Sequence, residues 1–191
     1  MAKVITVSRF YPSYHPRKGE PTYFVEKIWK SLVEKSQPYS FSPSYLSPYE
    51  KEYEKHYPCT YSDPLENIHN HNGKHHTIRA GKRWKTGDMA SIRVWGDDIN
   101  PKSGRKGAYH SKQITIAPDV EVTVYNVELW KQGLDCFIGQ RVNETSHTLL
   151  SFGEVARNDG LDFDDLKEWF KLKEDVIIEA QIICWNKNLK Y

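Results

Sequence analysis

A short stretch of the chain at residues 69–84, HNHNGKHHTIRAGKRW, carries most of the side chains that could take part in chemistry. Lys74 supplies an amine and Thr77 a hydroxyl. Amide hydrolysis needs a nucleophile, a proton acceptor and a group that stabilises the tetrahedral oxyanion. A threonine hydroxyl can attack once a base takes its proton. A lysine can be that base where burial lowers its pKa, or can hold the oxyanion where it stays charged.

Four histidines in the same stretch raise the alternative of a metal site: His69, His71, His75 and His76. Imidazole is a ligand that both zinc and nickel accept. However, no cysteine or carboxylate accompanies these histidines within the stretch, and Lys74 would place a cation among them. We therefore predict histidines that line a turn and the start of a strand, with no bound metal and no cofactor.

The local structure decides whether the amine and the hydroxyl can meet. In a regular strand, residues three apart face opposite sides of the sheet. Asn72-Gly73 is typical of a tight turn, and the following HTIRA has the pattern of a strand. With Lys74 in the turn and the strand beginning after it, the two groups could converge. Thr77 and Arg79 would then share one face of this strand.

Basic residues cluster around the same stretch, although the net charge of the chain is only +2. Such a surface would attract phosphate groups, and a tryptophan within it could stack on a nucleobase. The other interpretation is a solvated charged face with a tryptophan that belongs to the core. The residues expected to bind a ligand here are Arg79, Lys82, Arg83 and Trp84.

A second candidate binding element is HPRKGEPTYF at residues 15–24. We expect Pro21 to open a helix, because proline is favoured in the first helical turn. The free N–H groups and the dipole of a helix start can hold an anion, and Arg17 and Glu20 directly precede this start. Both are therefore candidate ligand-binding residues. The alternative is an ordinary surface loop.

Short strand-like segments dominate the chain beyond this point, and few helices separate them. A helix is expected where Asp162 can cap the first turn with Asp165 three residues later. Because helices do not alternate with every strand, the order favours a β-barrel with flanking helices over a doubly wound sheet. The expected strands are residues 4–10, 76–80, 89–95, 111–117, 120–130, 134–140 and 176–185.

Residues 36–68 differ from the rest in being rich in tyrosine, proline and serine. The sequence SPYE has the form of a capping box and predicts a helix from Pro48 to about His56. Tyrosines recur there at every fourth position and would form one aromatic stripe. This stripe could stack on bases or bind a protein partner, but packing of an inserted arm onto the body is the favoured interpretation.

The length of 191 residues fits a single domain, residues 1–191, that includes this insertion. No apolar run approaches the ~20 residues needed to span a bilayer, and the first residues do not have the pattern of a signal peptide. The three cysteines are far apart and form no zinc motif. We therefore expect a cytoplasmic protein with no membrane association.

The segment NGKHHTIRAGKRWKTGD resembles the signature of the ASCH domain, a family of PUA-like β-barrels. The later VARNDGLDFDDLKEWF resembles the acidic turn and helix of the family, and VIIEAQIICW its closing strand. The resemblance spans about residues 73–185 and implies an α+β fold, namely a PUA-like (ASCH) mixed β-barrel with flanking helices. The signature positions are Gly73, Lys74, Thr77, Arg79, Trp84 and Gly87-Asp88.

Some small ASCH proteins are amidohydrolases that deacetylate N4-acetylcytidine with a lysine, a threonine and a glutamate. Carried over by position, the resemblance implies Lys74, Thr77 and, at the acidic turn, Asp159 as the catalytic residues. Asp159 departs from the family because its side chain is one methylene shorter than glutamate. It would orient the lysine or pass a proton to the leaving amine.

Three hypotheses for function follow. The leading one is binding of a nucleoside, nucleotide or RNA in a cleft bordered by Lys74, Thr77, Arg79 and Asp159. The second is an amidohydrolase that acts on an acylated nucleoside such as N4-acetylcytidine. The third is a protein-interaction module that uses the tyrosine-rich arm at residues 36–68.

Overall fold

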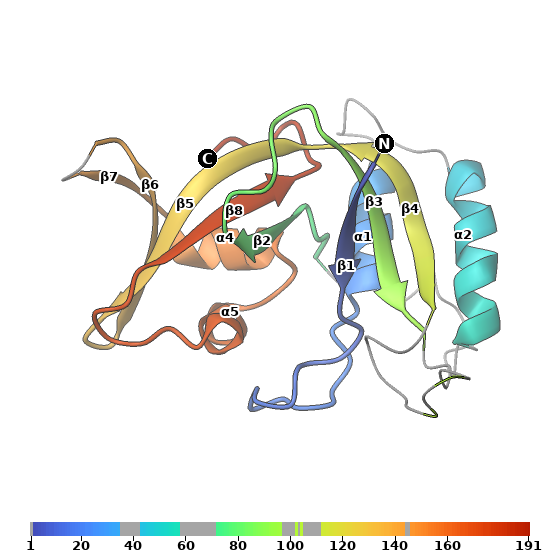
Figure 1. The fold of residues 1–191 in the computed structure, drawn as a ribbon, viewed down its shortest axis with the longest axis horizontal. Coiled ribbons are helices and arrows are strands. Elements are labelled where there is room, and N and C mark those ends of the chain that lie inside the picture. Colours follow the sequence, from blue (N-terminus) through green and yellow to red (C-terminus); the bar gives the residue numbers. More distant parts are fainter. Residues whose placement is uncertain are drawn as a thin grey trace.

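The computed structural model describes residues 2–34, 43–57, 72–96, 102, 104, 112–143 and 146–191. Within these residues the fold is α+β, with two β-sheets and four helices (Figure 1). This agrees with the α+β class expected from the sequence. Of the insertion at about 36–68, the structure describes residues 43–57.

The smaller sheet contains β1 (Lys3–Val7), β3 (Met89–Trp95) and β4 (Gln113–Glu121), in the order β1-β3-β4. β1 runs parallel to β3, and β3 runs antiparallel to β4. Ile5 and Val7 are buried on alternate positions of β1, as expected for a strand with one face on the core. The bounds of β3 match the strand predicted at residues 89–95.

The larger sheet is antiparallel and has the strand order β2-β8-β5-β6-β7. β8 lies between β2 and β5, and its last five residues are buried, so its apolar sequence correctly indicated a central strand. β7 was not expected from the sequence. The bounds are β2 (His76–Ala80), β5 (Thr123–Gln132), β6 (Asp135–Arg141), β7 (His147–Leu150) and β8 (Ile178–Cys184).

The two sheets meet at Val122, which separates β4 from β5. The Val122 N–H donates to the Asp88 carbonyl at 3.0 Å, and the Val122 carbonyl accepts from the Gly87 N–H at 2.9 Å. At the opposite side, the edge strands β1 and β2 do not pair with each other. Instead, the Arg79 guanidinium donates to the Thr6 carbonyl of β1. The described strands therefore do not form the closed β-barrel expected from the sequence, because a side chain stands where main-chain pairing would be needed.

α1 (Phe24–Val33) covers the smaller sheet and carries the apolar stripe predicted from its sequence. The indole Nε1 of Trp29 donates to the Ile116 carbonyl in β4 at 2.9 Å, which attaches the helix to the sheet. The buried apolar residues of this stripe are Phe24, Val25, Ile28, Trp29 and Leu32.

The start of α1 differs from the prediction that Pro21 opens the helix. Pro21 lies in an isolated β-bridge with Phe10. The Thr22 N–H donates to the Arg9 carbonyl at 2.8 Å. Both contacts hold this segment against residues 9–10, so the first helical residue is Phe24.

α2 (Pro43–His56) lies inside the insertion, beside β4 (Figure 1). The sequence predicts a helix that begins at Pro48, but the helix begins at Pro43 and Pro48 lies within it. Proline is favoured in the first turn because its missing N–H needs no partner there, and Pro43 takes that place.

Two tyrosines of the insertion pack onto the body. The Tyr53 ring is buried with its centre 5.5 Å from the Trp29 ring, in an edge-to-face arrangement. The Tyr57 hydroxyl donates to the Trp95 carbonyl at 2.6 Å. The packing interpretation is correct for both residues, whereas Tyr61 lies outside the described residues.

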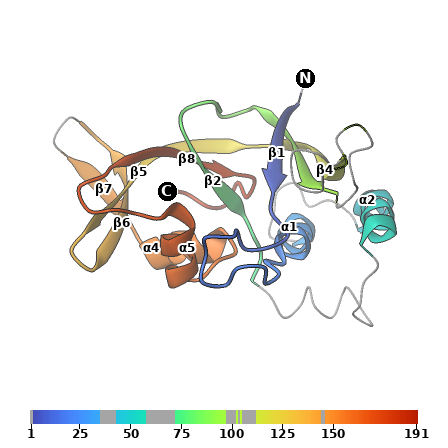
Figure 2. The ribbon, with the colours of Figure 1, turned by 60° about the horizontal axis from the view of Figure 1, so that its bottom comes forward.

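α4 (Phe152–Asn158) and α5 (Phe163–Phe170) lie on the same side of the strands as α1 (Figure 2). Asp162 caps α5 as predicted, accepting the Asp165 N–H at 2.8 Å. α4 was not predicted, although the Ser151 hydroxyl accepts the Glu154 N–H at 3.3 Å and this capping-box pattern is present in the sequence. In the part of the chain that the structure describes, no helix has the length and apolar character needed to cross a membrane.

Candidate functional site

The segment before β2 does not contain the tight Asn-Gly turn that the sequence predicts. Gly73 lacks the positive φ that such a turn requires. Instead, this segment crosses between α1 and the end of α4. The Lys74 N–H donates to the Lys27 carbonyl at 2.9 Å, and the His75 N–H donates to the Asn158 carbonyl at 2.7 Å. These two bonds, and not a turn, determine where the Lys74 side chain lies.

Lys74 and Asp159 form a buried ion pair. The Lys74 Nζ lies 2.9 Å from Asp159 Oδ1 and donates to the Asp159 carbonyl at 2.5 Å. It also lies 4.1 Å from the centre of the Phe24 ring. Only 1% of Lys74 and 6% of Asp159 are exposed. Because Asp159 ends α4, the ammonium also meets the negative end of that helix.

Burial shifts the pKa of both partners. Removal from water lowers the pKa of Lys74 to about 8, and the Asp159 carboxylate opposes this effect only in part. Burial likewise raises the pKa of Asp159, against the stabilising influence of the Lys74 charge. A lysine with a pKa close to neutral pH can hold or release its proton under ordinary conditions, which a surface lysine does not do.

His76 extends this buried polar cluster. Its Nδ1 lies 2.7 Å from the Tyr191 hydroxyl oxygen, which accepts a hydrogen bond from the Asn158 amide at 2.9 Å. Burial, followed by the nearby Lys74 charge, holds the pKa of His76 well below its usual value, so the ring is neutral. The Tyr191 hydroxyl then donates to Nδ1, and the ring proton is assigned to Nε2. This Nε2 lies 3.8 Å from Asp159 Oδ1, which is too far for a hydrogen bond.

Thr77 and Asp159 line one small cavity of about 40 Å³, together with Arg79. Asp159 Oδ1 is paired with the Lys74 ammonium, and the Thr77 hydroxyl forms no hydrogen bond with the described residues. Lys74 does not line this cavity and contacts it through Asp159. Of the three predicted catalytic residues, the structure thus pairs Lys74 with Asp159 and places Asp159 and Thr77 around one cavity, but it shows no hydrogen bond between Lys74 and Thr77.

A larger groove of about 290 Å³ lies between β1 and β2 and shares Thr6 and Arg79 with the small cavity. Arg83 and Trp84, two of the predicted ligand-binding residues, line it. The Arg83 guanidinium forms no ion pair or hydrogen bond with the described residues. Gln181 fixes the Trp84 main chain, accepting its N–H at 2.9 Å and donating to its carbonyl at 3.1 Å.

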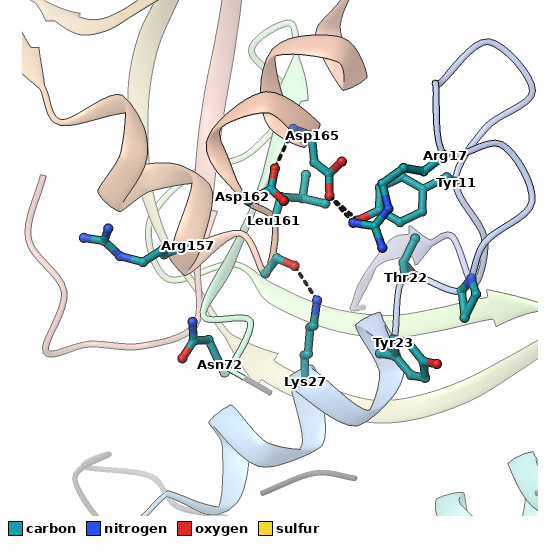
Figure 3. Close-up of a pocket in the computed structure, with 12 residues that line it drawn as sticks. Tyr11, Arg17, Thr22, Tyr23, Lys27, Asn72, Arg157, Leu161, Asp162 and Asp165 are labelled. Atoms are coloured by element: carbon teal, nitrogen blue, oxygen red, sulfur yellow. Dashed lines mark hydrogen bonds and ion pairs between the residues drawn. The ribbon is translucent and has the colours of Figure 1, made fainter. Parts of the chain in front are cut away.

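The other predicted ligand-binding residues lie elsewhere. Lys82 pairs with Glu179 at 3.0 Å and lines a separate surface groove. Arg17 bonds to Glu20 at 2.8 Å and to Asp165 at 2.6 Å. Arg17 lines a different pocket, shown in Figure 3.

Sequence reasoning missed three residues of this region. Gln181 is a buried amide within an apolar strand, and such an amide needs partners, so its position in the sequence was a usable signal. The contact between Tyr191 and His76 joins residues 115 positions apart, and no local pattern indicates it. Thr6 contributes a main-chain carbonyl, which no side-chain pattern can reveal.

The histidines do not assemble a metal site within the residues that the structure describes. No group of three or more His, Cys, Asp or Glu side chains is arranged there to hold a metal ion. His75 Nδ1 lies 3.2 Å from the Asn186 amide, and His76 contacts Tyr191. His69 and His71 lie outside the described residues.

Comparisons with protein-family models, curated proteins and solved structures each gave no match. The resemblance of residues 73–185 to the ASCH domain therefore stays an expectation. Function is inferred below from the geometry and the charges of the site.

Proposed function

We propose that the protein binds a nucleoside, nucleotide or RNA in the groove between β1 and β2, beside the buried Lys74–Asp159 pair. The observation that carries this proposal is the small cavity beside the groove, which the buried Asp159 carboxylate lines together with Thr77 and Arg79. A buried carboxylate accepts strong hydrogen bonds from N–H donors. A ligand N–H that entered the small cavity, such as the exocyclic amine of a nucleobase, would be such a donor.

The neighbouring groove offers the other contacts that a nucleotide needs. Trp84 provides an aromatic ring, and stacking on such a ring contributes ~1 to 3 kcal/mol per base. Arg83 has a guanidinium with no partner among the described residues and can pair with a phosphate. A cavity of about 40 Å³ holds only a small group. The base would therefore lie in the groove, with its amine or acylamine substituent directed toward Asp159.

The proposal includes a PUA-like arrangement of the two sheets and a cytoplasmic location. The sheets share the corner at Val122, and the edge strands β1 and β2 stand apart with Arg79 between them. This arrangement supports an open barrel in which the ligand reaches the interior between the two edge strands.

A second candidate function is hydrolysis of an acylamino group on a nucleoside, and the lowered pKa of Lys74 favours it. Strongly perturbed lysines beside a carboxylate are common at catalytic sites. With the acyl carbonyl in the small cavity, the Thr77 oxygen would attack the carbonyl carbon, and Asp159 would take the hydroxyl proton and relay it to neutral Lys74. The proton would pass through Asp159 to the leaving amine, and water would then hydrolyse the acyl-threonine ester.

Adjacent residues of the same charge provide the test of binding. Arg83→Met removes a cation from the groove, whereas Lys82→Met removes one that pairs with Glu179 outside it. We expect Arg83→Met to weaken binding of fluorescent single-stranded RNA by roughly tenfold and to reduce its salt dependence, with little effect of Lys82→Met. Equal losses in both variants, or binding that does not change with salt, would contradict the proposed groove.

Incubation with N4-acetylcytidine tests the second function. Release of cytidine and acetate by the wild type and by Lys82→Met, but not by Lys74→Ala, would support hydrolysis at this site. No release at high protein concentration would remove this function for that substrate. RNA binding through Arg83 would be unaffected by that result.

A further inference from the structure

A pocket of about 490 Å³ lies between the N-terminal loop, α1 and the turn that joins α4 to α5 (Figure 3). It is larger than the groove between β1 and β2, and none of the residues that line that groove lines it. Lys27, Arg157 and Asn72 come from three separate segments and line this pocket, and in Figure 3 the Arg157 side chain points away from Lys27 and would turn toward a ligand. The proposed nucleotide site uses none of these three side chains.

Lys27 is partly buried without a carboxylate partner among the described residues. Its ammonium donates to the Gly160 carbonyl at 2.6 Å, as the dashed line in Figure 3 shows. No Asp or Glu oxygen in the described part of the chain lies within ion-pair distance of it. Burial and then the Arg17 charge lower the pKa of Lys27, so an anion placed beside it would favour its charged form.

Arg157 adds a second cation without a partner. It is exposed at the end of α4 and forms no hydrogen bond or ion pair with the described residues. The Asn72 side chain likewise forms no hydrogen bond within that part of the chain. A guanidinium, an ammonium and an amide from separate segments together offer several N–H donors to one ligand.

The two acids that line the pocket are already engaged by the protein. Asp165 accepts hydrogen bonds from the Tyr11 hydroxyl at 2.5 Å and from Arg17 at 2.6 Å. Asp162 caps α5 through the Asp165 N–H. Arg17 therefore neutralises the Asp165 carboxylate, whereas Lys27 and Arg157 remain to bind a ligand.

We infer that this pocket binds the phosphoryl group of a small phosphate ester, with Lys27 and Arg157 as the charged contacts and Asn72 as a further donor. A phosphoryl group presents three terminal oxygens in different directions, which suits donors that come from three segments better than a flat carboxylate does. Tyr11, Tyr23 and Leu161 line the remaining volume and would contact the organic part of the ester. This inference goes beyond the proposed nucleotide groove and does not depend on it.

Gly160 marks the boundary between this pocket and the Lys74–Asp159 pair. A Cβ at this position would lie 3.2 Å from Lys27 Cδ and 3.2 Å from Lys74 Cβ. The pocket and the buried pair are thus in contact through one residue but use different lysines. Variants can therefore alter one site and leave the charges of the other in place.

Titration calorimetry with inorganic phosphate and with phenyl phosphate tests the inference. The second probe also reports contacts between the pocket and the organic part of the ester. Arg157→Met is the main variant, since the exposed Arg157 side chain forms no hydrogen bond or ion pair with the described residues and its loss should not disturb folding. We expect Arg157→Met and Lys27→Met each to weaken phosphate binding by roughly tenfold. As a control, Lys18→Met removes an exposed charge of the N-terminal loop. Lys18 does not line the pocket, so this change should alter phosphate affinity less than about twofold.

Arg83→Met distinguishes this site from the nucleotide groove. It should weaken RNA binding and leave phosphate affinity unchanged, whereas Arg157→Met should do the reverse. The inference is overturned if the wild type shows no saturable phosphate binding, or if Arg157→Met binds phosphate as the wild type does. Loss of phosphate binding in Lys18→Met to the same extent would also overturn it, because the effect would then be one of overall charge.

Discussion

Two lysine–carboxylate pairs flank β2 with nearly the same geometry and opposite surroundings. The Nζ–O distance is 2.9 Å in Lys74–Asp159, before the strand, and 3.0 Å in Lys82–Glu179, after it. The side chains of the first pair are 1% and 8% exposed, and those of the second 54% and 52%. The Nζ–O distance alone therefore does not measure what an ion pair contributes to stability, because water screens the second pair and not the first.

The difference also separates a surface contact from a candidate site. A solvated pair can be exchanged for other polar residues with little effect. A buried pair is costly to form and is a weak source of stability, so its presence beside a cavity suggests another role. Lys74 and Asp159 meet this description because Asp159 lines the cavity that Thr77 and Arg79 also line.

The largest expected contrast is in stability. Lys74→Met would leave the Asp159 carboxylate buried without a cation, and we expect a loss of ~3 to 5 kcal/mol in the free energy of unfolding. Lys82→Met should cost ~0 to 1 kcal/mol, because Glu179 stays in water. Urea denaturation of the two variants measures this difference. Similar losses in both would mean that burial does not distinguish the pairs.

Coupling energies sharpen the same contrast. A double-mutant cycle of Lys74→Met with Asp159→Asn should give an interaction energy of about 2 kcal/mol, since each side chain is the main charged partner of the other. The corresponding cycle of Lys82→Met with Glu179→Gln should give less than about 0.5 kcal/mol. Additive effects for the buried pair would show that the two side chains act independently.

Gly160→Ala should disturb the buried pair without changing its charges. Gly160 has a φ of 75°, and an added Cβ would press against Lys27 and Lys74. We expect a loss of ~1 to 2 kcal/mol from backbone strain and crowding. Gly133→Ala has a similar φ of 61° but nothing within 4 Å of the added Cβ, so it isolates the backbone part of the effect. A larger loss in Gly133→Ala would contradict the crowding at Gly160.

A further expected effect is a change of slope with pH. Folded Lys74 loses its proton near pH 8, whereas the unfolded chain keeps it to about pH 10.5. Between these values the unfolded state binds more protons, so this group makes the free energy of unfolding rise with pH. The stability difference between wild type and Lys74→Met should therefore increase across this range in denaturation series. A constant difference would mean that folding does not lower the pKa of Lys74.

Much of this arrangement could be predicted locally, and the parts that could not depend on distant contacts. The pattern of residue types in the sequence predicted β3 at its observed bounds, and the Asp162 capping residue predicted the start of α5. The family resemblance placed Lys74 near Asp159, but local sequence reasoning relied on an Asn-Gly turn that does not form. The actual cause is a pair of main-chain bonds to α1 and α4, which join segments far apart in the sequence.

The charged residues show the same limit. Arg17, Lys82 and Arg83 are equally basic in the sequence, yet the first two have carboxylate partners and only Arg83 lines the proposed nucleotide groove. Which cation is paired depends on residues such as Asp165 and Glu179, which are about a hundred or more positions away. Composition therefore predicts that a basic surface exists but not which of its residues can bind a ligand.

The most direct test of the proposed function is where a nucleic acid ligand touches the protein. Proton–nitrogen correlation spectra of the labelled protein, recorded during titration with single-stranded RNA, locate that contact residue by residue. We predict that the indole signal of Trp84 and the amide signals of Thr77, Arg79 and Arg83 shift, while those around Lys82 and Lys18 stay in place. Shifts confined to other surfaces, or no saturable shifts at all, would contradict binding between β1 and β2.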